Sequence, residues 1–199
     1  MPKRVGTFKD RGFTAIGSYI FAGGFALGVQ RHFNVLCHLE ETDYGVDTCH
    51  RNFPQLPIYV GFDHWPIEQL QMAQPVDLIF TNPPCAAWSP AGFDKKHGTG
   101  KWLTDPRVGC ARKCFSLLGA LRPRVWVWES VVQAYTKGWD FVRDLTVMAI
   151  QLGYSVTYLL HNSQYFGVPQ IRKRFFMVCH RVPFEPIEPG WGKIGRAHV

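Results

Sequence analysis

Cys85 of this 199-residue chain is a candidate for chemistry, because two prolines precede it in the segment Asn82-Pro83-Pro84-Cys85. The prolines fix the backbone and remove two N–H donors, so the thiol is held in one place. A thiol held near basic residues can ionise and act as a nucleophile. A buried cysteine with a purely structural role is the alternative.

A carboxylate stands at the end of a very apolar run, where Glu129 follows residues 125–128. Desolvation there raises the pKa of a carboxyl group, so that it can hold a proton near neutral pH. Together with the thiol it would form an acid and nucleophile pair. A glutamate that only caps the next helix is the alternative.

Two alternate arginines, Arg172 and Arg174, follow Gln170 and lead into another apolar run. Alternate residues of a strand point to one side. Two guanidinium groups on one side suit phosphate and base carbonyl groups. A basic edge strand that discourages aggregation is the alternative.

A glycine turn, Gly23-Gly24-Phe25 followed by Gly28, separates an apolar run from the start of a helix. Such a turn lets a ligand approach the backbone and the helix N-terminus, although tight packing would explain it equally well. Glu40 ends the next apolar run, where an acid can bind ribose hydroxyls or simply be solvated. The two features together favour a cofactor that carries a nucleoside.

The elements that must position these residues alternate along the chain. Because the expected strands are apolar runs, they predict an α/β fold with a mainly parallel sheet and helices on both faces. The candidate residues fall at the carboxyl ends of strands, where ligands bind in such sheets. We expect strands at 16–21, 34–39, 58–62, 76–81, 125–128, 155–160 and 174–180, and helices at 25–32, 44–52, 105–121 and 141–152.

The length suits one compact domain, and the charge is uneven. Lysine and arginine number 22 against 15 acids, and the whole excess lies in residues 95–124. A basic stripe suggests a polyanion such as nucleic acid, and a solvated helix face is the alternative.

The six cysteines are dispersed, with no C-x-x-C pair, which predicts free thiols, a reducing compartment and no metal. Basic residues before the apolar run 16–29 imitate a signal peptide, but glycines interrupt the run and it is too short to span a bilayer. We therefore expect neither secretion nor a membrane span.

Taken in order, these segments resemble the DNA cytosine-5 methyltransferase family over about residues 15–182. The match includes the family's Pro-Cys loop, its Glu-Asn-Val motif and its Gln-x-Arg-x-Arg segment. The corresponding parts of this chain are residues 77–92, Glu129-Ser130-Val131 and residues 170–174, together with the glycine loop 21–28 and the segment 105–107.

The resemblance implies a Rossmann-like methyltransferase that uses S-adenosylmethionine and acts on a cytosine flipped out of double-stranded DNA. Cys85 would attack C6 of the base, Glu129 would act at N3, Arg174 would hold O2, and Arg172 would assist. Ser89 and Gln170 would support substrate binding. The cofactor would lie against Phe21, Ala22, Gly23, Gly24, Phe25, Glu40, Asp63 and Pro84. We expect a cytoplasmic monomer, encoded by a bacterium or phage, that serves in restriction–modification or in a phage's defence against it.

Several residues depart from the family pattern: Tyr19 and Phe21 in the glycine loop, Thr81-Asn82 before the prolines, Ala86-Ala87-Trp88 after the cysteine, and Ser130. We expect an incomplete catalytic domain at 1–183 and a tail at 184–199, whose last six residues are artefactual, with no target-recognition domain. Other hypotheses are an amino-methyltransferase, a tRNA cytosine methyltransferase and a non-catalytic nucleic-acid-binding fragment.

Overall fold

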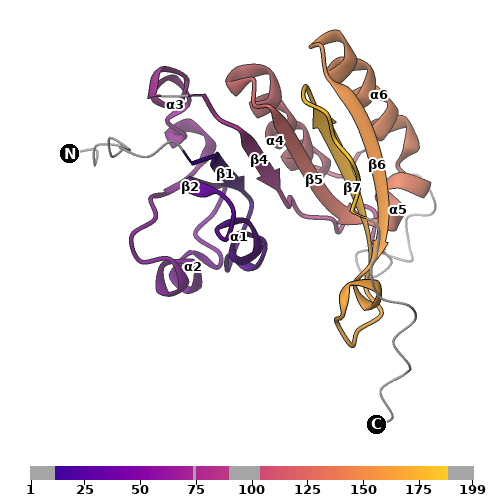
Figure 1. Ribbon diagram of the computed structural model, residues 1–199, viewed down its shortest axis with the longest axis horizontal. Coiled ribbons are helices and arrows are strands. Elements are labelled where there is room, and N and C mark those ends of the chain that lie inside the picture. The colour runs from indigo at the N-terminus through magenta and orange to yellow at the C-terminus, as the bar shows by residue number, and fades with distance from the viewer. Residues whose placement is uncertain (1–11, 74, 90–103, 188–199) are drawn as a thin grey trace.

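A computed structural model describes residues 12–73, 75–89 and 104–187 of the chain. Its centre is one seven-stranded sheet in the order β3-β2-β1-β4-β5-β7-β6 (Figure 1). The strands are β1 (Thr14–Ser18), β2 (Asn34–Glu40), β3 (Ile58–Val60), β4 (Leu78–Thr81), β5 (Val125–Val131), β6 (Ser155–Asn162) and β7 (Lys173–His180).

Helices cover both faces of the sheet, as the apolar strands predict. Helices α1 (Gly24–Val29) and α2 (Val46–Asn52) lie on one side (Figure 1). The other side carries α3 (Ile67–Ala73), α4 (Val108–Leu121), α5 (Val132–Thr136) and α6 (Trp139–Gln151). A large apolar core fills the space under this second group, and a smaller one lies under α1 and α2. Short 3-10 helices occupy Phe62–His64 and Ser163–Phe166.

One strand runs against the others, and its direction matters for the site. The pairs among β1 to β5 are parallel, whereas β7 is antiparallel to both β5 and β6. The first residues of β7 therefore lie beside the last residues of β5. In this register Arg174 is opposite Val131, and Phe176 is opposite Glu129. The antiparallel strand thus brings the arginine segment to the edge at which the parallel strands end.

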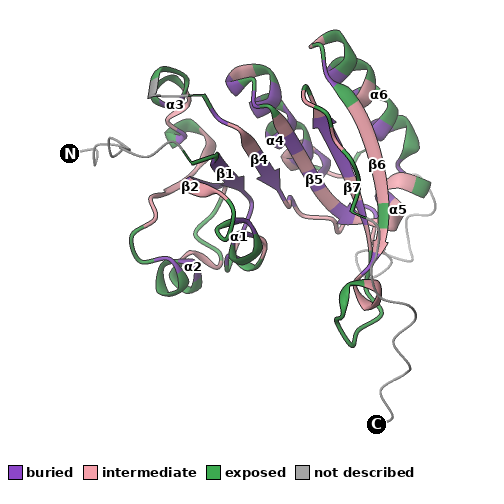
Figure 2. Cartoon of the chain, in the orientation of Figure 1, coloured by how far each residue is buried: buried purple, intermediate pink, exposed green. Residues whose placement is uncertain are grey.

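Burial along β5 alternates, although its sequence is an unbroken apolar run. Trp126, Trp128 and Ser130 are buried beneath the helices, while Val127 and Glu129 on the other face are half-buried (Figure 2). On this second face, side chains of β5, β6 and β7 line a cavity together with the segments 163–168 and 184–187. The face on which Glu129 lies is consequently open to a cavity.

The predicted elements are found with shifted ends. The first strand ends at Ser18 and not at residue 21, because Tyr19 and Phe21 adopt left-handed backbone angles, each with φ 54°. Strand β5 continues three residues beyond its predicted end, to Val131. Helices α3 and α5 were not predicted, because each is too short to show a helical period.

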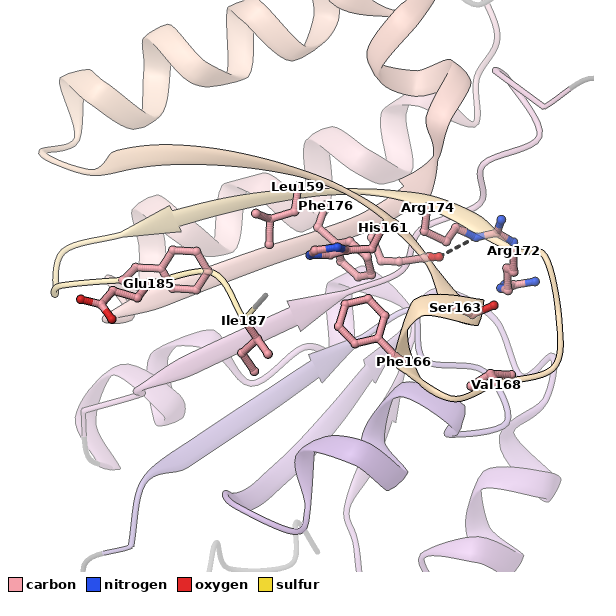
Figure 3. Close-up of a pocket in the computed structure, with 12 residues that line it drawn as sticks. Leu159, His161, Ser163, Phe166, Val168, Arg172, Arg174, Phe176, Glu185 and Ile187 are labelled. Atoms are coloured by element: carbon pink, nitrogen blue, oxygen red, sulfur yellow. Dashed lines mark ion pairs between the residues drawn. The ribbon is translucent and has the colours of Figure 1, made fainter. Parts of the chain in front are cut away.

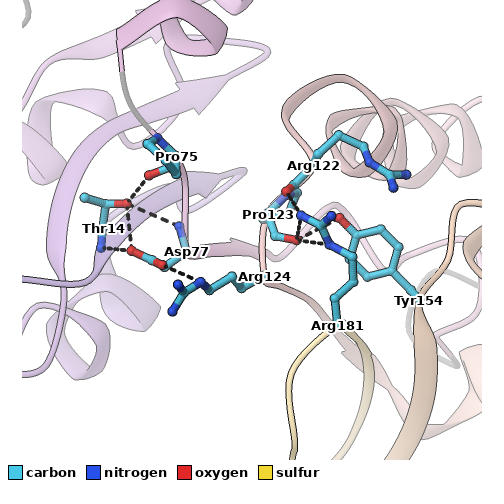
Figure 4. Close-up of polar contacts among 8 residues, drawn as sticks. All are labelled: Thr14, Pro75, Asp77, Arg122, Pro123, Arg124, Tyr154 and Arg181. Carbon is cyan, nitrogen blue, oxygen red and sulfur yellow. Dashed lines mark hydrogen bonds and ion pairs between the residues drawn. The ribbon is translucent and has the colours of Figure 1, made fainter.

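Polar contacts join residues near the amino ends of β1, β4 and β5, at the end of the sheet away from the site (Figure 4). The backbone N–H of Thr14 donates to Asp77 Oδ2 at 2.9 Å, and Arg124 Nε lies 3.3 Å from Asp77 Oδ1. The Tyr154 hydroxyl donates to the Pro123 carbonyl at 2.7 Å. These contacts bind the starts of β1, β4 and β5 to one another.

None of the described helices is long and apolar enough to cross a membrane.

Candidate active site

Two adjoining cavities open at the carboxyl edge of the central strands. The first, of about 460 Å³, is lined by the glycine loop, by Asn82 after β4 and by Glu129. The second, of about 610 Å³, runs over the open face of β5, β7 and β6. Both cavities are lined by Glu129, Arg172 and Phe176. The carboxyl group therefore lies where the cofactor side and the open sheet face meet.

Two side chains hold the carboxyl group of Glu129. Arg174 Nε lies 2.7 Å from Glu129 Oε1, and the side-chain amide of Asn82 donates to Oε2. Burial raises the pKa of Glu129 above the usual carboxyl range, while Arg174 and Arg172 act in the opposite direction. The predicted desolvation of this residue is thus present and is partly offset by two cations.

The arginine segment is held by the end of β6. Asn162 Oδ1 accepts a hydrogen bond from the Arg172 N–H at 3.0 Å, and the Ser163 N–H donates to the Arg172 carbonyl at 3.1 Å. Arg172 and Arg174 lie at the same end of the larger cavity (Figure 3), as their alternate spacing predicts. Gln170 is exposed and lines neither cavity; its carbonyl accepts a hydrogen bond from the Ser163 hydroxyl at 2.6 Å.

The Pro-Cys loop turns sharply after β4. The N–H groups of Trp88 and Ser89 both donate to the Cys85 carbonyl, each at 3.0 Å. Trp88 is 2% exposed and packs against Trp128 and Phe141, with ring centroids 5.6 and 5.5 Å apart. Cys85 itself is half-buried and free. The loop therefore has one buried anchor, three residues after the thiol, although Cys85, Ser89 and Pro84 line neither cavity.

The glycine loop wraps one side of the smaller cavity. Phe21, Ala22, Gly24 and Phe25 line it, while Gly23 takes φ 90° at the start of α1. A Cβ atom at Gly23 would stand 2.3 Å from a ring carbon of Phe53, so the turn requires glycine there. Backbone in this form leaves room for a ligand above the helix start.

Glu40 supports the glycine loop from below. Its Oε1 accepts hydrogen bonds from the N–H groups of Ile20 at 2.6 Å and Phe21 at 3.1 Å. Burial raises the pKa of this carboxyl group to about 7, against the two backbone donors that lower it. Ribose binding by Glu40 stays a prediction. The hydrogen bonds that Glu40 makes to the glycine loop were not predicted from the sequence. Asp63 is exposed in the turn after β3 and lines neither cavity.

These residues fit a nucleoside-bearing cofactor. The cavity beside the glycine turn adjoins a buried acid at the end of β2, which is the arrangement that such cofactors use in parallel sheets. By contrast, no group of three or more His, Cys, Asp or Glu side chains suited to a metal ion occurs among the described residues.

Five cations of the basic stripe predicted for residues 95–124 lie in the described part of the chain. They follow α4 and its flanks, and each has an intramolecular partner. These are Arg107 with Asp105, Arg112 with Phe141, Lys113 with Glu41 and Phe62, Arg122 with Tyr154, and Arg124 with Asp77. Lys95, Lys96 and Lys101 lie outside the described residues.

The family model and the related proteins point to the same family. The family model of C-5 cytosine-specific DNA methylase matches residues 19–190. The Type II methyltransferase M1.HphI of Haemophilus parahaemolyticus is 30% identical over 172 residues, which cover 83% of this chain and 45% of that protein. M.HindV of Haemophilus influenzae is 28% identical, over 78% of this chain and 49% of its own length. The chain thus spans less than half the length of these two relatives.

Solved structures share the fold. The methyltransferase EhMeth of Entamoeba histolytica superposes with a TM-score of 0.68 at 18% identity, over 89% of this chain and 56% of its own. DNMT2 of Spodoptera frugiperda gives a TM-score of 0.63 at 18% identity, over 85% of this chain and 50% of its own. The family model covers most of the chain, and the chain belongs to the C-5 cytosine-specific DNA methylase family.

Proposed function

We propose that the protein methylates C5 of cytosine in double-stranded DNA, with S-adenosylmethionine as the methyl donor. The observation that carries this proposal is the position of Glu129. It is held by Arg174 at the junction of two cavities, one of which borders the glycine loop. The family match supports the same reaction.

The chemistry begins at Cys85. C5 of cytosine is a poor nucleophile until a group adds at C6, and a thiolate is suited to that addition. The new S–C6 bond places electron density on N3, where Glu129 supplies a proton or a hydrogen bond. Arg174 holds the base O2 and, through its ion pair, the carboxyl group itself.

When bound, S-adenosylmethionine would supply an electrophilic methyl group to C5 and would leave as the neutral thioether. N3 then gives its proton back to Glu129. A water molecule takes the C5 proton, the C5–H electron pair forms the C5–C6 double bond, and the Cys85–C6 bond breaks to release the thiolate. Ring aromaticity is restored, and Glu129 is back in its starting state.

The cofactor would be held by the glycine loop and by Glu40. Ala22, Gly24 and Phe25 border the cavity, and Glu40 fixes the backbone of Ile20 and Phe21. We further propose that Asp63 contacts the adenine amino group and that Ser89 and Gln170 support the DNA. A bacterial restriction–modification setting is proposed from the Type II methyltransferase relatives.

The test is methyl transfer followed by identification of the product nucleoside. The protein is incubated with radiolabelled S-adenosylmethionine and either duplex DNA or tRNA. The proposal predicts 5-methylcytosine in DNA. N4-methylcytosine or N6-methyladenine would instead support an amino-methyltransferase, and label in tRNA alone would support the RNA enzyme.

A further inference from the structure

Asn82 joins the ends of three neighbouring strands. It directly follows β4, and its backbone N–H donates to the Ser18 carbonyl at the end of β1, at 3.1 Å. Its side-chain Nδ2 donates to the Glu129 carboxylate Oε2 and lies 3.4 Å from the Glu129 carbonyl on β5. The residue also lines the smaller cavity. The sequence marked it only as a departure from the small residues usual before the prolines.

The two oxygens of Glu129 have different partners. Oε1 faces the Arg174 guanidinium on β7, with Arg172 as a second cation nearby, and Oε2 faces the Asn82 amide from β4. Contacts on both oxygens, from the strands on either side of β5, fix the plane of the carboxyl group. An arginine alone would leave the group free to rotate about its last bond.

A neutral donor on Oε2 has a chemical consequence. A cation beside a carboxylate adds its full charge to the hydrogen bond and therefore stabilises the ionised form more than a neutral amide does. A second cation on Oε2 would hold Glu129 ionised, which opposes proton donation to the base. The neutral amide orients the carboxyl group but stabilises its negative charge less than a cation would. The carboxyl group therefore stays able to take up and release a proton.

We propose that Asn82 is a positioning residue for the proposed reaction, whose side-chain amide orients the Glu129 carboxyl group between the cofactor cavity and the base. The inference rests on the proposed function, and Asn82 acts through Glu129 and not on the base itself. Its position three residues before Cys85 means that one short segment sets both the nucleophile and the acid.

The structure offers a matched control one residue away. The Thr81 hydroxyl donates to the Val127 carbonyl at 3.1 Å, which also joins β4 to β5. Thr81 is fully buried and has no described contact with Glu129. Thr81→Val therefore removes a β4–β5 hydrogen bond of similar structural value and leaves the carboxyl group untouched.

The test measures Glu129 directly in the chain. Carbon-13 label at the glutamate side-chain carboxyl is titrated by NMR, and the Glu129 signal is identified by its loss in Glu129→Gln. We expect Asn82→Ala to raise the pKa of Glu129 by about one unit, because a donor to the ionised form is lost. We expect Thr81→Val to leave that pKa where it is. Equal shifts in both variants, or none in Asn82→Ala, would overturn the proposal.

A second variant keeps the test valid if Asn82→Ala fails to fold. Asn82→Asp has the same shape but loses the amide donor, and its own charge should raise the pKa of Glu129 further. In an active protein we also expect the alkaline limb of the pH profile of kcat to move upward. If Glu129 responds as expected but cytosine is never methylated, the proposed function fails and the geometry stands. If cytosine is methylated but Glu129 does not respond, the inference fails.

Discussion

Trp88 and Gly138 fit together so closely that a Cβ atom at Gly138 would lie 2.5 Å from Trp88 Nε1. It would also lie 2.6 Å from the Ala134 carbonyl oxygen. Gly138 has an ordinary backbone conformation, with φ −95°. Glycine is therefore required there because a Cβ atom has no room, and not because of the backbone angle. The anchor of the Pro-Cys loop is thus set by a glycine between α5 and α6, far away in the sequence.

Gly138→Ala should therefore displace Trp88 and loosen the Pro-Cys loop. Overpacking of a rigid core site costs about 1–3 kcal/mol, which chemical denaturation will measure as a lower free energy of unfolding. Gly119→Ala is the control, because Gly119 lies inside α4 and its Cβ would meet only Leu152 at 3.8 Å. That change should stabilise the protein by up to ~1 kcal/mol through helix propensity. Equal stability of the two variants would contradict the close fit.

Gly23→Ala should destabilise the chain through the glycine loop. The residue has φ 90°, and its Cβ would meet Phe53 at 2.3 Å, so strain and overlap act together. We expect a loss of roughly 2 kcal/mol or more in thermal or chemical unfolding. Adding Phe53→Leu should recover the part due to overlap and leave the part due to strain. Full recovery in the double variant would show that the backbone angle costs nothing.

Glu40→Gln should change how stability depends on pH. Burial raises the pKa of Glu40 from 4.5 to about 7, so the folded chain binds this proton more tightly than the unfolded chain. The free energy of unfolding contributed by Glu40 therefore falls as pH rises from 4.5 through 7, by on the order of 3 kcal/mol. Relative to Glu40→Gln, the unsubstituted chain should lose stability across this window in urea titrations. A constant difference between the two would contradict the account.

His38 should make stability depend on pH in the opposite direction to Glu40. It is fully buried, its Nδ1 lies 3.1 Å from Cys49 Sγ, and burial lowers its pKa to about 4. The unfolded chain then binds the proton more readily, so stability is lost as pH falls from 6.5 through 4. His38→Phe, which keeps a ring beside Phe53 and Phe80, should remove this acid sensitivity. The check is the unfolding midpoint at pH 7 and at pH 5, and an unchanged pH difference would disprove it.

The placement of the candidate residues at strand ends was predictable because apolar runs followed by Gly, acid or Cys mark those ends directly. The residue patterns predicted Glu129 and the two arginines separately, and only the family resemblance implied that they meet. Their meeting depends on the antiparallel direction of β7, which pairs residues 47 positions apart, such as Glu129 and Phe176. Strand order is a tertiary property that local patterns do not encode.

Other features escaped prediction for local reasons. The left-handed Tyr19 and Phe21 end β1 early, although aromatic residues usually favour strands. Glu40 also binds two backbone N–H groups of the loop through Oε1, which the sequence did not predict. The partners of a buried acid depend on how the loop above it folds, which no spacing in the sequence reveals.

The central claim is that Cys85 bonds covalently to C6 of a cytosine, and trapping that bond tests it most directly. The protein, S-adenosylmethionine and duplex DNA containing 5-fluorocytosine are incubated and examined by denaturing gel and mass spectrometry. Fluorine blocks the final elimination, so the account predicts a stable adduct on the peptide that contains Cys85, and none with Cys85→Ala. An adduct that persists in Cys85→Ala, or methylation of cytosine C5 by that variant, would contradict it.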